Sequence, residues 1–149
     1  MAKPRGRSKP AKDSKFPDPK VWKGCKAEGC TKYAPFLEEY CWEHLSSKAR
    51  KGYVKKIEEW VEKGHSLEGV DLRQVILDGI NLRGANLFKA NLGLADFKKA
   101  HLSEANLQEA NLGGANLSEA DLRKANLQGA DLGGIYLRKA NLSEANLQE

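Results

Sequence analysis

The chain has 149 residues and carries 25 Lys/Arg against 20 Asp/Glu, a formal net charge of +5. No apolar run approaches the ~20 residues that a membrane-spanning helix needs, and the start, MAKPRGRSKPAKDSK, lacks the apolar core of a secretory signal. We therefore expect a cytoplasmic protein with no membrane association. The charge is uneven, because residues 1–69 hold 16 Lys/Arg against 10 Asp/Glu whereas residues 70–149 hold 9 against 10.

Residues 1–20 combine seven Lys/Arg with four prolines and a single aromatic residue, Phe16. Such a stretch buries too little apolar surface to offset the entropy lost on ordering. We predict a disordered basic tail over residues 1–20.

Residues 21–45 contain all three cysteines, in the segment CKAEGCTKYAPFLEEYCWEH with the spacing C-x4-C-x10-C-x2-H. Three thiolates and one imidazole suit tetrahedral zinc, and four protein ligands leave no position for a catalytic water. The segment resembles a treble-clef zinc finger, although the x4 gap is wider than the usual two. We predict a structural zinc ion bound by Cys25, Cys30, Cys41 and His44; the alternative is that the cysteines are reduced and uncoordinated.

Residues 46–64 are predicted to form one amphipathic helix. The apolar residues Tyr53, Val54, Ile57, Trp60 and Val61 follow helical spacing, and a glycine at position 64 is a typical helix stop.

The period then changes to five. From position 72 to position 147 every fifth residue is Leu, except for Phe97, and the residue two positions earlier is small or aliphatic. A period of five fits neither a strand nor a helix, so a repeat architecture must be considered first. Four units of five residues make one turn of twenty, with the Leu and the small residue directed inward, and turns stack at roughly strand spacing.

This pattern resembles the pentapeptide-repeat family, which implies a mainly β fold. We expect a right-handed quadrilateral β-helix of about four coils over residues 65–149, preceded by the zinc module and the helix. The larger inward residues Val70, Val75 and Ile80 lie in the first turn, which the helix is expected to cap. The last turn has no such lid, and we expect a homodimer or a partner contact there.

Stacking at twenty residues aligns the outward residues in columns. Charge sign alternates from turn to turn on two sides, whereas a third side is nearly bare backbone, with glycine at positions 93, 113, 114, 133 and 134. Glycine either serves tight corners only or forms a protein-docking face. The candidate protein-docking face consists of Gly93, Gly113, Gly114, Gly133 and Gly134.

The functional expectation follows from this division. The repeats hold no phosphate-binding loop and no nucleophile elbow, so we expect no enzyme. Basic residues suited to phosphate contacts are Lys3, Arg5, Arg7, Lys9, Lys12, Lys15, Lys20, Lys23, Lys26 and Lys32. We expect a nucleic-acid-associated protein that favours structured RNA over DNA and resembles ribosome-associated proteins.

Three alternatives remain. The basic tail can act as a non-specific solubility segment, and the solenoid can serve as a protein-interaction scaffold. The resemblance also implies a DNA mimic that binds type II topoisomerases, but a mimic needs a continuous acidic face, and the alternating charges do not supply one.

Overall fold

The computed structural model describes residues 46–148, so the predicted basic tail and zinc module lie outside the described residues. One helix, α1, spans Ser47–Glu62. It begins where the Ser46 hydroxyl accepts a hydrogen bond from the Ala49 N–H at 3.2 Å, the capping contact typical of serine. It ends at Lys63, and Gly64 then takes a left-handed conformation with φ 75°.

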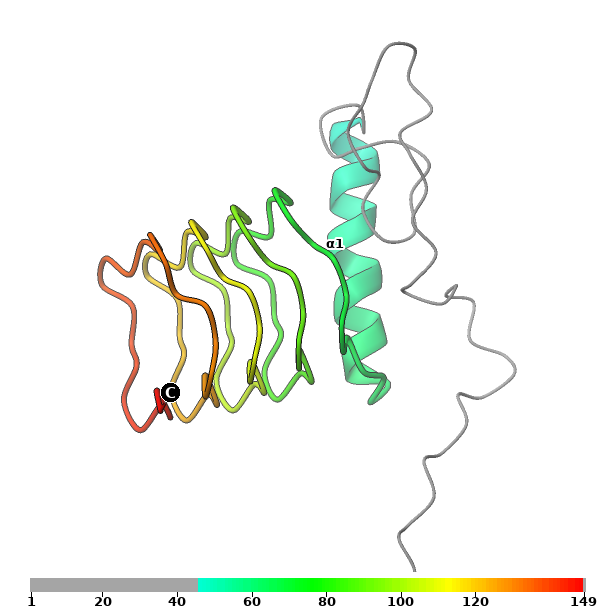
Figure 1. The fold of residues 1–149 in the computed structure, drawn as a ribbon. Coiled ribbons are helices and arrows are strands. Elements are labelled where there is room, and N and C mark those ends of the chain that lie inside the picture. Colours follow the sequence, from blue (N-terminus) through cyan, green and yellow to red (C-terminus); the bar gives the residue numbers. More distant parts are fainter. Residues whose placement is uncertain (1–45, 149) are drawn as a thin grey trace, which may run out of the picture.

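Helix α1 stands across the first turn of the repeats (Figure 1). Tyr53 and Ile57 are fully buried, and Val54, Trp60 and Val61 pack against the same core. The Glu58 carboxylate accepts a hydrogen bond from the Asn81 backbone N–H at 2.9 Å. In later turns, the N–H at this position donates to a carbonyl of the preceding turn, as His101 does to Ile80. The helix therefore covers the core and also supplies one acceptor that a preceding turn would have provided.

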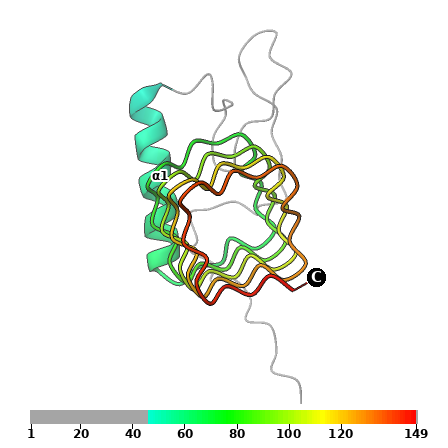
Figure 2. The ribbon, with the colours of Figure 1, turned by 90° about the vertical axis from the view of Figure 1, so that its left-hand side faces the viewer.

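The repeats wind into a four-sided coil, which Figure 2 shows from its C-terminal end. Parallel β-bridges join residues twenty positions apart, from Asp71 and Asn91 to Asn126 and Asn146. The predicted turn of twenty residues is thus confirmed. The register begins one unit before position 70, because Leu67 is buried and its N–H donates to the Asn86 carbonyl at 2.9 Å.

Within residues 46–148 each side of the coil contributes single bridge residues rather than a longer strand. The cause is the corner residue, which lies two positions after each central Leu. All sixteen corner residues from Gly69 to Glu144 have φ between 56° and 68°. A left-handed residue in every unit of five interrupts the extended backbone, so the predicted extended side shortens to one bridge.

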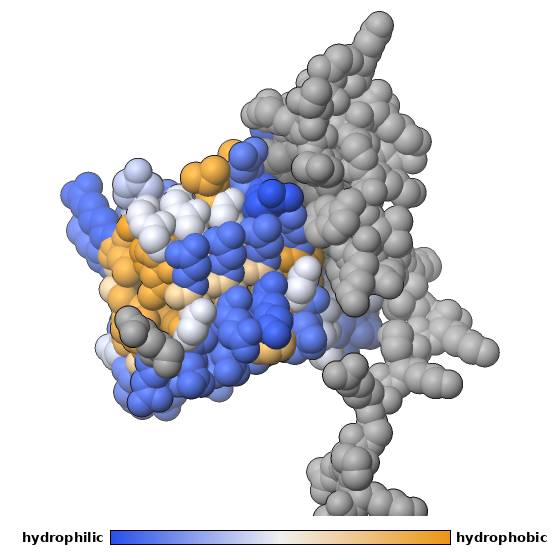
Figure 3. All heavy atoms as spheres, viewed as in Figure 1, coloured by the Kyte–Doolittle hydropathy of each residue, from blue (hydrophilic) through white to orange (hydrophobic). Residues whose placement is uncertain are grey.

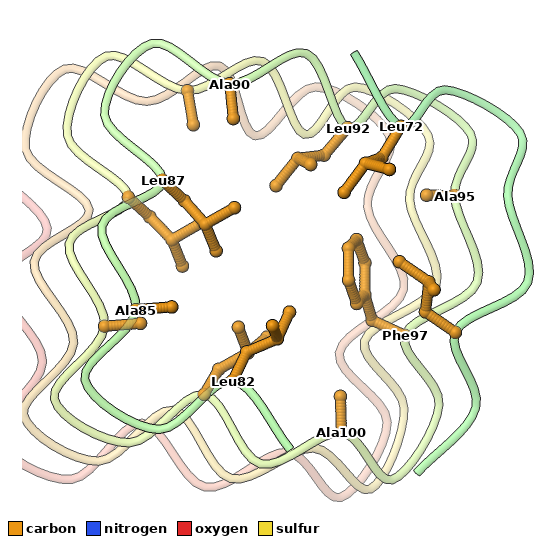
Figure 4. Packing of buried hydrophobic residues seen from close by; sticks show 14 of the residues in the cluster. Leu72, Leu82, Ala85, Leu87, Ala90, Leu92, Ala95, Phe97 and Ala100 are labelled. Carbon is orange, nitrogen blue, oxygen red and sulfur yellow. The ribbon is translucent and has the colours of Figure 1, made fainter. Parts of the chain in front are cut away.

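The core is a column of Leu and Ala side chains that point inward from all four sides (Figure 4). Leu72 to Leu122 are nearly fully buried at every fifth position, and Phe97 occupies the one position where Leu is replaced. The Asn/Asp position stabilises the corner, because its side-chain oxygen accepts the N–H two residues later, as Asn111 does from Gly113 at 2.9 Å.

Candidate docking surface

Opposite charges meet between neighbouring turns on the solenoid surface. Arg83 and Glu104 lie 2.7 Å apart, Lys89 and Glu109 3.2 Å, and Lys124 and Glu144 3.8 Å. All six side chains are about half exposed or more, so each pair contributes little to stability. Arg83–Glu104 and Lys124–Glu144 lie on one of the sides where charge sign alternates in the sequence, whereas Lys89–Glu109 lies on another side.

The glycine face consists of Gly93, Leu94, Gly113, Gly114, Gly133 and Gly134. Exposure increases along the column from buried Gly93 to exposed Gly133 and Gly134. Gly114 and Gly134 are corner residues with φ 68° and 67°, so the backbone itself favours glycine there. Gly93, Gly113 and Gly133 precede the corner and are not among the positive-φ residues. Corner geometry therefore explains two of these five glycines. At Gly113 and Gly133 a Cβ atom would lie only 3.2 Å and 3.1 Å from the Oδ1 atom of the residue two positions earlier, so local packing also favours glycine there.

Leu94 is the unusual residue of the glycine face. It is 63% exposed, and it sits at a corner with φ 59°, a conformation that disfavours a residue with a bulky side chain. A Cβ atom built on Gly114 would lie 2.6 Å from Leu94 Cδ2. The leucine side chain therefore lies over the bare backbone of the next turn, where it forms an exposed apolar contact point.

A second apolar area lies at the end of the solenoid farthest from α1 (Figure 3). The inward residues of the last turn are only partly buried, and Leu147 is 52% exposed. Members of this area are Ala130, Leu132, Ile135, Leu137, Ala140, Leu142, Ala145 and Leu147.

The two edges of a turn differ in hydrogen-bonding character. Toward the following turn, one unit presents the N–H groups of Leu72 and Gln74 as donors and the Val70 carbonyl as acceptor. Toward the preceding turn, the next turn presents the Asn91 and Gly93 carbonyls and the Asn91 N–H. The edge facing away from α1 is thus rich in donors, and the edge facing α1 is rich in acceptors.

The other predicted site residues precede the described part of the chain. The four zinc-ligand candidates and the ten basic candidates all lie before residue 46, outside the described residues. Within residues 46–148 no group of three or more His, Cys, Asp or Glu side chains could hold a metal ion. No helix in this part of the chain is long and apolar enough to cross a membrane.

Comparison with known proteins decides the family. A family model described as Pentapeptide repeats (8 copies) matches residues 66–103, 100–138 and 122–149, which together exceed half of the chain. The chain belongs to the pentapeptide repeat family. Pentapeptide repeat proteins form right-handed β-helices and are generally structural or interaction proteins rather than enzymes.

Solved pentapeptide repeat structures resemble this one over the repeats. Rfr23 from the cyanobacterium Cyanothece 51142 is 43% identical, with a TM-score of 0.51 and coverage of 52% of each chain. A protein of the Arabidopsis thaliana thylakoid lumen is 33% identical, with a TM-score of 0.35 and coverage of 55% of this chain and 61% of that one. HetL from Nostoc sp. PCC 7120, involved in heterocyst differentiation regulation, is 41% identical, with a TM-score of 0.30 and coverage of 54% and 40%.

The chain spans about half the length of Rfr23. No curated protein matches it.

Reasoning from the sequence missed two features, one on the solenoid surface and one on α1. Leu94 lies in a nearly bare column, and the signal that could have found it is a leucine at a corner position beside glycine. Glu58 lies off the apolar stripe of the helix, and its contact with Asn81 depends on how α1 sits on the first turn, which periodicity does not specify.

Proposed function

We propose that this pentapeptide repeat protein is a non-enzymatic scaffold whose solenoid is a rigid body for docking a protein partner. The exposed left-handed Leu94 supports this proposal most strongly. Ten corners carry a residue other than glycine, and in nine of them it is Lys, Glu or Gln. A leucine at this position exposes apolar area and adds backbone strain without adding to the core.

The glycine face suits a protein partner in shape. Flat backbone around one apolar side chain lets a partner's main chain or aromatic ring approach closely, and the stacked coil keeps the surface rigid. Rigidity lowers the entropy that binding must overcome.

A photo-crosslinking amino acid at position 94 tests the proposal, with the same amino acid at position 99 as the matched control. Both positions are exposed corners with φ 58° to 59°. We expect a discrete protein adduct from position 94 and not from position 99. The same adducts from both positions, or none from either, would contradict docking at the glycine face.

Charge distribution favours a second activity, nucleic-acid binding by the N-terminal segment. Residues 1–45 contain ten Lys/Arg against six Asp/Glu, and the ten include Lys3, Arg5 and Arg7. Structured RNA is the partner class we propose, by analogy with ribosome-associated proteins. Co-sedimentation with ribosomes over a salt series, for the full chain and for a chain starting at Val21, tests it. Equal co-sedimentation of the two chains at every salt concentration, or no co-sedimentation at low salt, would contradict the proposal.

We also propose structural zinc at Cys25, Cys30, Cys41 and His44, because thiolate and imidazole donors in this number suit tetrahedral zinc. Protein purified without chelator should contain one zinc ion per chain, and Cys25→Ser with Cys41→Ser should abolish it. An undiminished zinc content in the double variant would show that the metal binds elsewhere.

A further inference from the structure

The charge boundary of the chain falls inside α1 rather than between α1 and the segment before it. Residues 1–56 hold 15 Lys/Arg against 6 Asp/Glu, a net charge of +9, whereas residues 57–149 hold 10 against 14, a net charge of −4. The N-terminal half of α1 therefore belongs electrostatically to the basic segment, although its apolar face belongs to the solenoid core.

Three of the five basic residues of α1 lie on the face turned away from the core. Lys48, Lys51 and Lys55 are spaced by three and four residues, which places them along one side of a helix, and all three are exposed. The buried residues Tyr53 and Ile57 lie on the other side. We call Lys48, Lys51 and Lys55 the lysine stripe.

Folding does not account for the lysine stripe. Lys48 lies in the first turn of α1, which contains no acidic residue, and a cation there interacts unfavourably with the helix dipole. Lys55 has an ion pair with Glu59 at 3.6 Å, but the two side chains are 77% and 48% exposed, so this contact stabilises little.

We propose that the lysine stripe of α1 binds the phosphate backbone of a nucleic acid. This inference rests on the proposed nucleic-acid binding and locates a contact surface on the described part of the chain. Exposed lysines supply point charges, which suit phosphates regardless of base sequence. The net negative charge after residue 56 repels a polyanion and directs it to the α1 end of the molecule.

Binding of a fluorescein-labelled RNA hairpin to the full chain, followed by fluorescence anisotropy over a potassium chloride series, tests the proposal. The variant Lys48→Gln/Lys51→Gln/Lys55→Gln removes the stripe. The control Lys98→Gln/Lys99→Gln/Lys139→Gln makes the same charge change on the solenoid. We expect the first variant to bind about tenfold or more weakly at low salt, and its log–log salt slope to fall by roughly 0.7 to 0.9 for each phosphate that the lysines no longer neutralise.

The affinity of the solenoid control should stay within about twofold of the wild type, because its lysines lie away from the proposed contact. The variant Lys48→Arg/Lys51→Arg/Lys55→Arg keeps the three positive charges and should therefore retain the wild-type salt slope. An unchanged affinity and slope in the Gln variant, with the wild type binding, would overturn the lysine stripe and leave the nucleic-acid proposal standing. No binding by the wild type at low salt would overturn both. Displacement of the RNA by polyglutamate at equal charge concentration would overturn the assignment to nucleic acid in favour of an acidic protein.

Discussion

At the level of single residues, the corner of each repeat sets the shape of the coil. Ten corners carry a residue other than glycine at φ between 56° and 63°, so the stacked turns tolerate strain that would be unfavourable in an isolated peptide. Two kinds of hydrogen bond hold the corner in place. The Asn/Asp side-chain oxygen accepts the backbone N–H two residues later, and backbone groups of neighbouring turns bond to each other. A glycine at a corner therefore either relieves backbone strain or makes room for a neighbouring side chain.

Two glycine corners separate these effects. Gly114→Ala places a Cβ atom against Leu94 Cδ2, whereas Gly134→Ala has nothing within 4 Å and the same φ within 1°. We expect Gly134→Ala to lower the free energy of unfolding by about 1 kcal/mol and Gly114→Ala by about 1 to 2 kcal/mol. The excess should disappear in a Leu94→Gly background, measured by urea denaturation. An equal effect of the two single substitutions would show that Leu94 moves aside without cost.

The Asp121–Arg123 pair makes stability depend on pH. The hydrogen bond from the Arg123 guanidinium lowers the pKa of Asp121 from 3.8 to about 2. A carboxyl whose pKa is lower in the folded state contributes stability that is fully present above the unfolded pKa and is lost as the pH falls through the folded pKa. The contribution should therefore be constant above pH about 5 and decline between pH about 4 and about 2.

Arg123→Gln tests this dependence. The difference in unfolding free energy between wild type and Arg123→Gln should shrink as the pH falls from about 4 to about 2. Arg138→Gln is the matched control, and its difference from the wild type should stay constant over this range. Parallel pH profiles for wild type and Arg123→Gln would contradict the assignment.

At the level of elements, α1 acts as the first layer of the solenoid. Its extent was predictable, because helical spacing of five apolar residues and Gly64 gave bounds within about two residues of Ser47–Glu62. The hydrogen bond from the Asn81 N–H to Glu58 was not predictable, because the two residues are 23 positions apart and the register between helix and coil depends on packing.

Glu58→Ala should remove the acceptor for the Asn81 N–H and lower the free energy of unfolding by about 0.5 to 1.5 kcal/mol. Glu58→Gln retains a carbonyl oxygen and should recover part of that stability. Glu59→Ala, on the exposed side of α1, serves as the control and should change stability by less than about 0.5 kcal/mol. Thermal or chemical denaturation measures all three. Equal effects of Glu58→Ala and Glu59→Ala would mean that the contact with Asn81 is not stabilising.

At the level of the whole molecule, the inward column and the stacking period followed directly from the sequence, because every unit repeats the same apolar spacing. The corner conformation was less visible, since six of the sixteen corners are glycine and ten carry other residues. The polarity of the edges could not be read from composition at all, because it is a property of the backbone in this coil.

That polarity bears on self-association. The last described turn presents an edge rich in N–H donors beside exposed Leu147, and two copies meeting end to end would oppose donor to donor. Helix α1 stands across one side of the acceptor-rich end and obstructs head-to-tail stacking there. Edge polarity therefore favours the partner contact over the homodimer, the two alternatives that the sequence left open, and a partner at this edge should present carbonyl groups. Sedimentation velocity of residues 1–149 tests this expectation. A dimer that Leu147→Lys dissociates would contradict this expectation.

Docking of a protein through Leu94 is the conclusion on which the proposed scaffold function depends. Leu94→Gly tests it, because glycine removes both the exposed side chain and the backbone strain. The measurement is the affinity of the partner crosslinked at position 94, compared between wild type, Leu94→Gly and Lys99→Gly, with unfolding midpoints recorded in parallel. We predict that Leu94→Gly binds about tenfold or more weakly, as expected for truncation of an anchor residue, while its unfolding midpoint stays the same or rises. An affinity equal to that of Lys99→Gly would contradict docking through Leu94.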